Sequence, residues 1–150
     1  MTAEKFFIEQ QIVDAVRKML TEKVNEILKD AQFVVPPIEF NTNINGFSVS
    51  PVIILSGCER TEKERIIRVD AYSVSVTFEL PETHESEYYC YAYTAAVSAA
   101  IDENPTLGGV INRVEILSKK YVPPKKLNCG EGWGLVLTVR VTVEDMGNDG

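Results

Sequence analysis

Strict alternation of apolar and polar side chains near the end of the chain limits the fold more than any other feature. Successive side chains of a β-strand point to opposite faces of a sheet, so this pattern predicts a strand with one covered face and one face open to solvent. Such a strand needs neighbouring strands and a layer that covers its apolar side. The apolar positions are Leu135, Leu137, Val139, Val141 and Val143, and between them lie Val136, Thr138, Arg140, Thr142 and Glu144.

Two segments have the three- and four-residue apolar spacing of helices that could supply this layer. The first spans about 4–29, with Thr2 as a candidate N-cap, and it ends before Pro36 and Pro37, which cannot continue a helix. The second spans about 82–102 and begins with acidic residues, which the positive end of a helix dipole favours. Its "AAVSAA" run is small enough to lie close against a sheet.

Three further segments are predicted strands. The apolar run 51–58 is followed by a charged turn, "ERTEKER", and then by a strand over 66–80, which together predict a hairpin. The apolar positions of 66–80 change phase near Asp70 and Ala71, which predicts a β-bulge or a twist there. Another strand covers 110–121, and the last strand follows Trp133. Segment 33–50 is predicted as a long connection or an irregular edge strand, and the roles of 33–50 and 122–132 stay open.

The order helix, two strands, helix, two strands predicts an α+β fold. We expect a four-stranded, mainly antiparallel sheet with two helices packed on one face. A ferredoxin-like arrangement with a different strand order is the alternative. At 150 residues the chain suits a single domain over 1–150, with a flexible polar tail over 145–150.

The net charge of −7 argues against sequence-specific nucleic-acid binding, because affinity for phosphate comes mainly from clustered Lys and Arg. The charge is uneven: 79–103 holds six acids and no Lys or Arg, whereas 113–126 holds five Lys or Arg residues and one acid. We hypothesise that these segments meet between copies of the chain, and two separately solvated faces are the alternative. The predicted interface residues are Arg113, Lys119, Lys120, Lys125 and Lys126, facing Glu82, Glu85 and Glu87 of a neighbour.

Three scattered cysteines without a CxxC pair indicate free, buried thiols in a reducing compartment. Cys58 lies close to Arg60, which can lower a thiol pKa, although a turn cysteine beside charges is usually incidental. Charges interleave the apolar residues of the N-terminus, so we expect neither a signal peptide nor a membrane span, and a cytoplasmic site of synthesis.

The sequence predicts no catalytic, metal or cofactor site. His84 is the single histidine and lies in the acidic start of the second helix, a poor setting for a nucleophile's base. One histidine and three dispersed cysteines give no paired zinc ligands. We therefore expect a protein that is not an enzyme.

The stretch "DENPTLGGV" is glycine-rich, yet its order is wrong for a phosphate loop. A helix precedes the glycines and a strand follows them, and a helix C-terminus repels phosphate. We interpret it as a structural corner in which Asn104 and Pro105 end the helix, Leu107 packs where helix meets sheet, and Gly108 and Gly109 adopt angles that a side chain would forbid.

These features together resemble the tail-terminator and tail-completion proteins of long-tailed bacteriophages and prophages. The likeness lies in the N-terminal helix "IVDAVRKMLTEKVNEIL", the central strand pair, the helix ending in "NPTLGGVINRVEI" and the last strand "GLVLTVRVTVED". Its one sharp motif is 104–109.

The resemblance implies a structural virion-assembly subunit without catalytic residues or cofactors. Such a subunit forms a homo-oligomeric ring, classically hexameric, that caps the tail tube and contacts head completion proteins. It implies assembly in the cytoplasm and a final place in the virion tail or neck, as a terminator, a neck adaptor or a baseplate component. A stand-alone cytoplasmic α+β binding domain without catalytic activity is the alternative.

Overall fold

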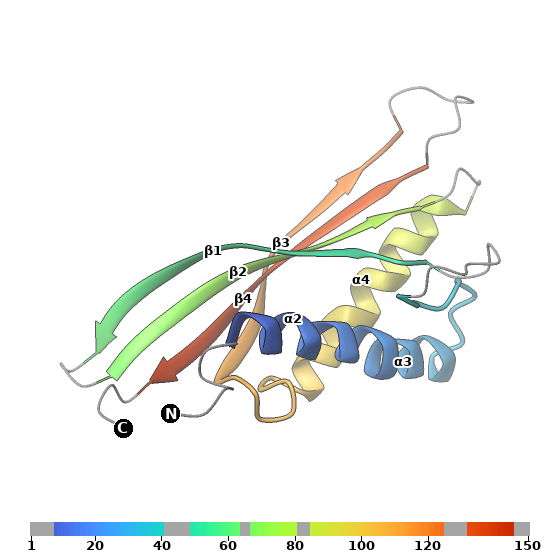
Figure 1. Cartoon of the computed structure of the whole chain (residues 1–150). Coiled ribbons are helices and arrows are strands. Elements are labelled where there is room, and N and C mark those ends of the chain that lie inside the picture. The colour runs from blue at the N-terminus through green and yellow to red at the C-terminus, as the bar shows by residue number, and fades with distance from the viewer. Residues whose placement is uncertain (1–7, 41–48, 64–66, 81–84, 125–131, 146–150) are drawn as a thin grey trace.

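The architecture is α+β, in the predicted order of helix, two strands, helix and two strands, which confirms the predicted class (Figure 1). The computed structural model describes residues 8–40, 49–63, 67–80, 85–124 and 132–145. Thr2, residues 146–150 and most of the 122–132 connection lie outside these ranges. The strands are β1 Val52–Lys63, β2 Ile67–Glu79, β3 Arg113–Val122 and β4 Gly134–Asp145.

The four strands form one sheet in the order β1-β2-β4-β3, and every neighbouring pair is antiparallel. β1 and β3 are therefore the two edges. This arrangement is the first of the two that the sequence suggested. The β1–β2 hairpin reaches past the helices at one end of the twisted sheet, and β3 and β4 reach past them at the other (Figure 1).

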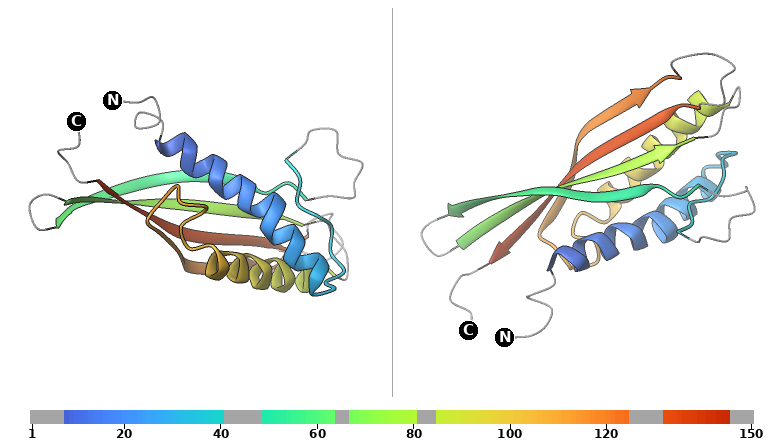
Figure 2. Two further views of the ribbon diagram at one scale, coloured as in Figure 1. Left: turned by 90° about the horizontal axis from the view of Figure 1, so that it is seen from below. Right: turned by 45° about the horizontal axis from the view of Figure 1, so that its top comes forward.

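Both helical layers lie on the same face of the sheet, as predicted (Figure 2). Every second side chain is buried against them over 72–78 of β2 and 135–141 of β4. The residues between lie on the open face and are half-buried, except Arg140, which is exposed. Phe78 stacks on Tyr93 of helix α4, Ser86–Glu103, with ring centroids 4.9 Å apart. One apolar core therefore joins the sheet and the helices, with Tyr72, Val74, Val76, Phe78, Leu135, Leu137, Val139 and Val141 as its sheet side.

The first helix is continuous but not uniform. It consists of α2 Ile8–Lys18, a π-helical stretch η1 Met19–Val24, and α3 Asn25–Asp30. The wider turn is stabilised by side chains, because the Thr21 hydroxyl donates to the carbonyls of Arg17 and Lys18 at 3.1 and 3.3 Å. Apolar spacing alone does not distinguish this stretch from an ordinary α-helix.

Asn25 joins the end of this helix to the segment that leads to the sheet. Its Nδ2 donates to the carbonyls of Thr21 and Ile38 at 2.8 and 2.9 Å, and its Oδ1 accepts the Ile38 N–H at 2.8 Å. Ile38 forms an isolated parallel bridge with Val49. The described ends of 33–50 thus form one bridge rather than an edge strand of the sheet.

The predicted charged turn after residue 58 is wrong in its position, because β1 continues to Lys63. Arg60 lies directly opposite Asp70 of β2, and its guanidinium bonds both carboxylate oxygens, at 2.7 and 3.1 Å. A charged pair directly across two antiparallel strands supports pairing, so charged residues here extend the hairpin.

The predicted bulge near Asp70 and Ala71 is also wrong, because β2 pairs without interruption there. The irregularities lie in the edge strands instead, where Ser56 of β1 and Leu117 of β3 are each an extra residue. The two are at the same level, since Leu55 and Ile116 both align with the central Val74–Val139 pair. The change of phase in the sequence of β2 has another cause. The first residues of β2 lie beyond the helices, so over 68–71 neither face of the strand is buried.

Candidate interaction surface and its corner

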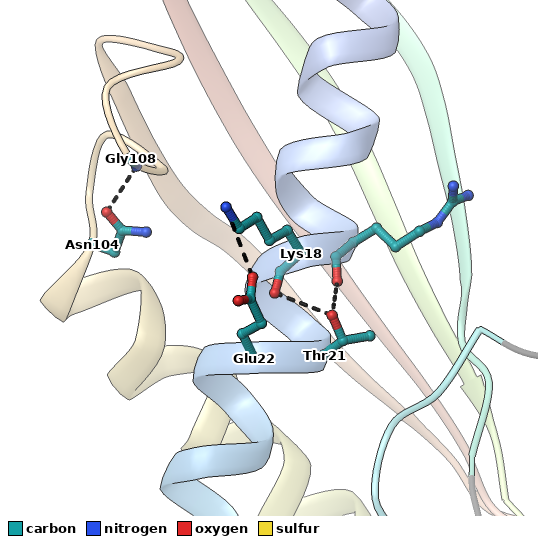
Figure 3. Close-up of polar contacts among 6 residues, drawn as sticks. Lys18, Thr21, Glu22, Asn104 and Gly108 are labelled. Carbon is teal, nitrogen blue, oxygen red and sulfur yellow. Dashed lines mark hydrogen bonds and ion pairs between the residues drawn. The ribbon is translucent and has the colours of Figure 1, made fainter.

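The residues singled out at 104–109 form a tight turn between α4 and β3. Helix α4 ends at Glu103, and Leu107 is buried with a positive φ of 49°. Gly108 and Gly109 follow with φ of 74° and 87°, angles that favour glycine. The Asn104 Oδ1 accepts the Gly108 N–H at 2.9 Å (Figure 3). Pro105 completes the corner, because its carbonyl accepts the Val114 N–H at 2.8 Å.

The predicted start of this strand at 110 is wrong, because 105–112 belongs to the corner and β3 begins at Arg113. Val110 is accordingly exposed rather than aligned with Val114. The glycine angles explain the difference, since a left-handed turn has to be completed before an extended strand can begin.

Replacing Gly109 with alanine is expected to lower the free energy of unfolding by about 1–2 kcal/mol, because a Cβ disfavours its left-handed backbone. Gly57→Ala is the matched control, since a Cβ there meets nothing within 4 Å and its φ is not in the left-handed region. Urea unfolding would compare the two. Equal effects would contradict a conformational role for Gly109.

A groove of about 660 Å³ lies between the corner and the first helix. Its walls come from α2 and η1 on one side and from the end of α4 and the corner on the other (Figure 3). Lys18 and Glu22 lie along the first wall 4.0 Å apart, and Glu103 lines the second. Acidic, basic and apolar side chains all line this groove, so its chemistry does not favour one class of ligand over another.

The acidic and basic segments were predicted to face each other between copies, but parts of them are neighbours within one chain. Tyr91 of α4 meets Tyr121 of β3 edge-on, with centroids 5.5 Å apart, and its hydroxyl bonds Glu87 at 2.8 Å. This bond raises the pKa of Tyr91. Glu87 thus bonds a side chain of α4 that contacts the end of β3.

Two other predicted interface residues already have partners within the chain. Glu85 accepts a bond from the Tyr89 hydroxyl at 3.2 Å, one turn along α4. Arg113 is at the opposite end of β3, where it pairs with Glu115 at 3.5 Å, and Glu115 pairs with Arg140 at 3.7 Å. Glu82, Lys125 and Lys126 lie outside the described residues. Among the described members of the set, Arg113 therefore lies at one end of β3 and Lys119 and Lys120 lie toward the other.

Sequence reasoning missed the edge strands as a place where apolar side chains gather. Nine large apolar or aromatic side chains are exposed within the described residues, and five of them lie on β1 or β3. Alternation in β1 and β3 could have indicated this, but an edge cannot be identified before the strand order is known. The five are Val52, Ile54, Leu117, Tyr121 and Val122.

The cysteines differ in their surroundings. Cys90 is buried in α4, and burial raises the pKa of its thiol to about 11. Cys58 is exposed on β1, which contradicts its predicted burial. Arg60 does not lower the pKa of this thiol overall, because burial of the sulfur and the nearby Asp70 carboxylate outweigh it and raise the pKa. Cys129 and His84 lie outside the described residues.

In a Cys129→Ser background, a thiol reagent at pH 8 is expected to modify Cys58 in the folded protein and Cys90 only after unfolding. A thiol pKa of about 11 and burial leave Cys90 without accessible thiolate at this pH. Mass spectrometry of each site would measure the rates. Equal rates at Cys58 and Cys90 in the folded protein would contradict the burial of α4.

Within the described ranges, no group of three or more His, Cys, Asp or Glu side chains is arranged to hold a metal ion. The described helices include none with the length and apolar character needed to cross a bilayer. A scan against protein-family models gives no match, and a search of curated proteins gives none either.

Proposed function

We propose that this chain is a structural subunit of a phage-like tail, of the terminator or neck type, which assembles with its own copies. In this role it forms a ring that caps the tail tube and joins it to head completion proteins. One observation carries the proposal: exposed apolar side chains concentrate on the two edge strands of a sheet whose second face is covered by none of the described helices. Such surfaces suit subunit contacts better than small ligands.

The corner is a second source of support. The 104–109 motif, on which the resemblance to tail terminators mainly rests, has a definite structural task here. It turns the chain from α4 into the edge strand β3 and fixes the start of that strand through the bond from Val114 to Pro105.

Deleting the gene from its host tests the proposal, with electron microscopy of the particles as the readout. A cap ends polymerisation of the tube, so its loss is expected to give tubes of uncontrolled length that carry no heads. Expression of the wild-type chain from a plasmid should restore joined particles. Normal tailed particles without the gene would overturn the proposal, as would neighbouring genes unrelated to capsid, tube or tape-measure proteins.

The groove beside the corner favours a second candidate, a stand-alone binding domain. Its volume of about 660 Å³ is within the range of small-molecule sites. A domain of this kind would be monomeric and its deletion would leave particles unchanged. The mixed charges of the lining and its open position make this the weaker candidate.

A further inference from the structure

We propose that two copies of this chain join edge to edge, with β1 of one copy pairing with β3 of the next. This inference rests on the self-association in the proposed function, and it names the surfaces that meet. The contact is head-to-tail, because each copy uses its β3 edge to bind one neighbour and its β1 edge to bind the other. A contact of this type generates a closed ring or an open filament rather than a two-fold dimer.

The strand directions suit this contact. A sheet of four strands in the order β1-β2-β4-β3, antiparallel throughout, has edge strands that run in opposite directions. A second copy in the same orientation therefore places its β1 antiparallel to the first copy's β3. The sheet would continue without a change of pattern, and the helices of both copies would remain on the same side, because the second copy has the same orientation as the first.

The free parts of the two edges lie at the same level. The register across the sheet aligns Val52 with Lys120, through Thr77 and Val136. On β1 the regular stretch 52–55 ends at the Ser56 bulge, and on β3 the regular stretch 118–122 begins after the Leu117 bulge. Before its bulge β3 is partly blocked, because the Pro105 carbonyl takes the outward N–H of Val114. Bulges limit indiscriminate edge pairing, and these two regular stretches lie level with each other on the two edges.

Both stretches carry exposed apolar side chains, which is unusual for edges that face only water. Val52 and Ile54 of β1 are 53% and 52% exposed, and Tyr121 and Val122 of β3 are 36% and 38% exposed. Leu117, the bulge residue at the start of the β3 stretch, is 46% exposed. Beside β3 the surface continues onto α4, where Tyr91 is exposed and contacts Tyr121. The exposed part of α4 between Glu87 and Asp102 carries no charge.

Charge and coverage distinguish this contact from two-fold alternatives. Pairing β3 with β3 would bring Lys119 and Lys120 of both copies together, and like charges across strands are destabilising. Pairing β1 with β1 would leave the apolar side chains of both β3 strands in water. In the head-to-tail contact Glu59 of β1 is level with the oppositely charged Arg113 of β3, and both side chains are exposed on the open face.

Two single variants test the inference by complementation, with native mass spectrometry or analytical ultracentrifugation as the readout. Ile54→Lys damages the β1 edge and leaves β3 intact, and Leu117→Lys damages the β3 edge and leaves β1 intact. We expect each variant alone to need about tenfold or more protein to assemble, because a charge enters an apolar contact. Their equimolar mixture is expected to form heterodimers and nothing larger, since each pair retains one intact contact.

Val34→Lys is the matched control, because Val34 is 80% exposed and lies outside the sheet, and it should assemble as the wild type does. Circular dichroism checks that all variants fold. Normal assembly of Leu117→Lys would indicate β1–β1 pairing, and normal assembly of Ile54→Lys would indicate β3–β3 pairing. Either result overturns the inference without contradicting self-association. A wild-type chain that stays monomeric overturns the inference and also counts against the ring of the proposed function. Failure of the proposed function is seen separately, in the particles made without the gene.

Discussion

Replacing Asn25 with leucine is expected to lower the free energy of unfolding by about 2–4 kcal/mol. The change keeps the size of the side chain but removes its bonds to both backbone groups of Ile38, at 2.8 and 2.9 Å. Ile38 is fully buried, so its N–H and carbonyl would lose their partners with little access to water. Each unsatisfied buried group costs about 1–3 kcal/mol. Urea unfolding followed by circular dichroism measures the loss.

Two variants make this result specific. Asn25→Asp keeps an acceptor for the Ile38 N–H but loses the donor, so an intermediate loss is expected. Gln10→Leu removes an exposed amide that bonds Asp14 within α2, and should cost less than about 0.5 kcal/mol. If Asn25→Leu costs no more than Gln10→Leu, then Asn25 does not anchor the segment before β1.

Replacing Phe78 with alanine is expected to have a still larger effect, about 3–5 kcal/mol. Phe78 is fully buried on β2, and its ring stacks on that of Tyr93 with an interplanar angle of 14°. Removing the ring leaves a cavity between the sheet and α4 that the rigid strand cannot close. Thermal and denaturant unfolding would both report the loss.

Phe78→Leu is the control, because it keeps most of the apolar volume and should cost about 1–2 kcal/mol. Tyr93→Phe separates the hydroxyl from the ring, since it removes only the bond from Tyr93 to the Pro36 carbonyl at 2.6 Å and should cost about 1 kcal/mol. A loss for Phe78→Ala below that for Tyr93→Phe would show that this part of the core is not closely packed.

The layers of the fold were predictable because each depends on a local pattern. Alternation from Leu135 to Val143 indicates a half-covered strand, and it matches the burial of β4. Three- and four-residue spacing predicted the first helix, in which Ile12, Val16 and Leu20 are buried. These patterns follow from burial itself, which repeats every two residues in a strand and about every 3.6 in a helix.

Features that depend on single long-range contacts were not predictable. Asn25 resembles any polar residue of a helix surface, and nothing near it in sequence indicates that Ile38 will lie beside it. Arg60 likewise appears as a turn residue until the hairpin register brings it opposite Asp70. Propensity assigns charged residues to loops, and here the tertiary pairing prevails.

The candidate surface shows the same division. The corner at 104–109 could be assigned from glycine and proline chemistry, because backbone angles are a local property. The charged interface was inferred from segment charge, which does not say where the segments lie. Once folded, α4 and the end of β3 are neighbours through Tyr91 and Tyr121, so opposite charges in sequence need no second copy to explain them.

The extra residues at Ser56 and Leu117 have a consequence for how this chain could change in length. Each extra residue reverses the face of the sheet toward which every later side chain of its strand points. A deletion at position 56 would thus do more than shorten β1 by one residue. It would turn Glu59 toward the helices and Cys58 toward the open face, exchanging the two sides of half a strand. Homologous chains are therefore expected to gain or lose residues in the hairpin tips, while the lengths of β1 and β3 on either side of these two positions remain constant.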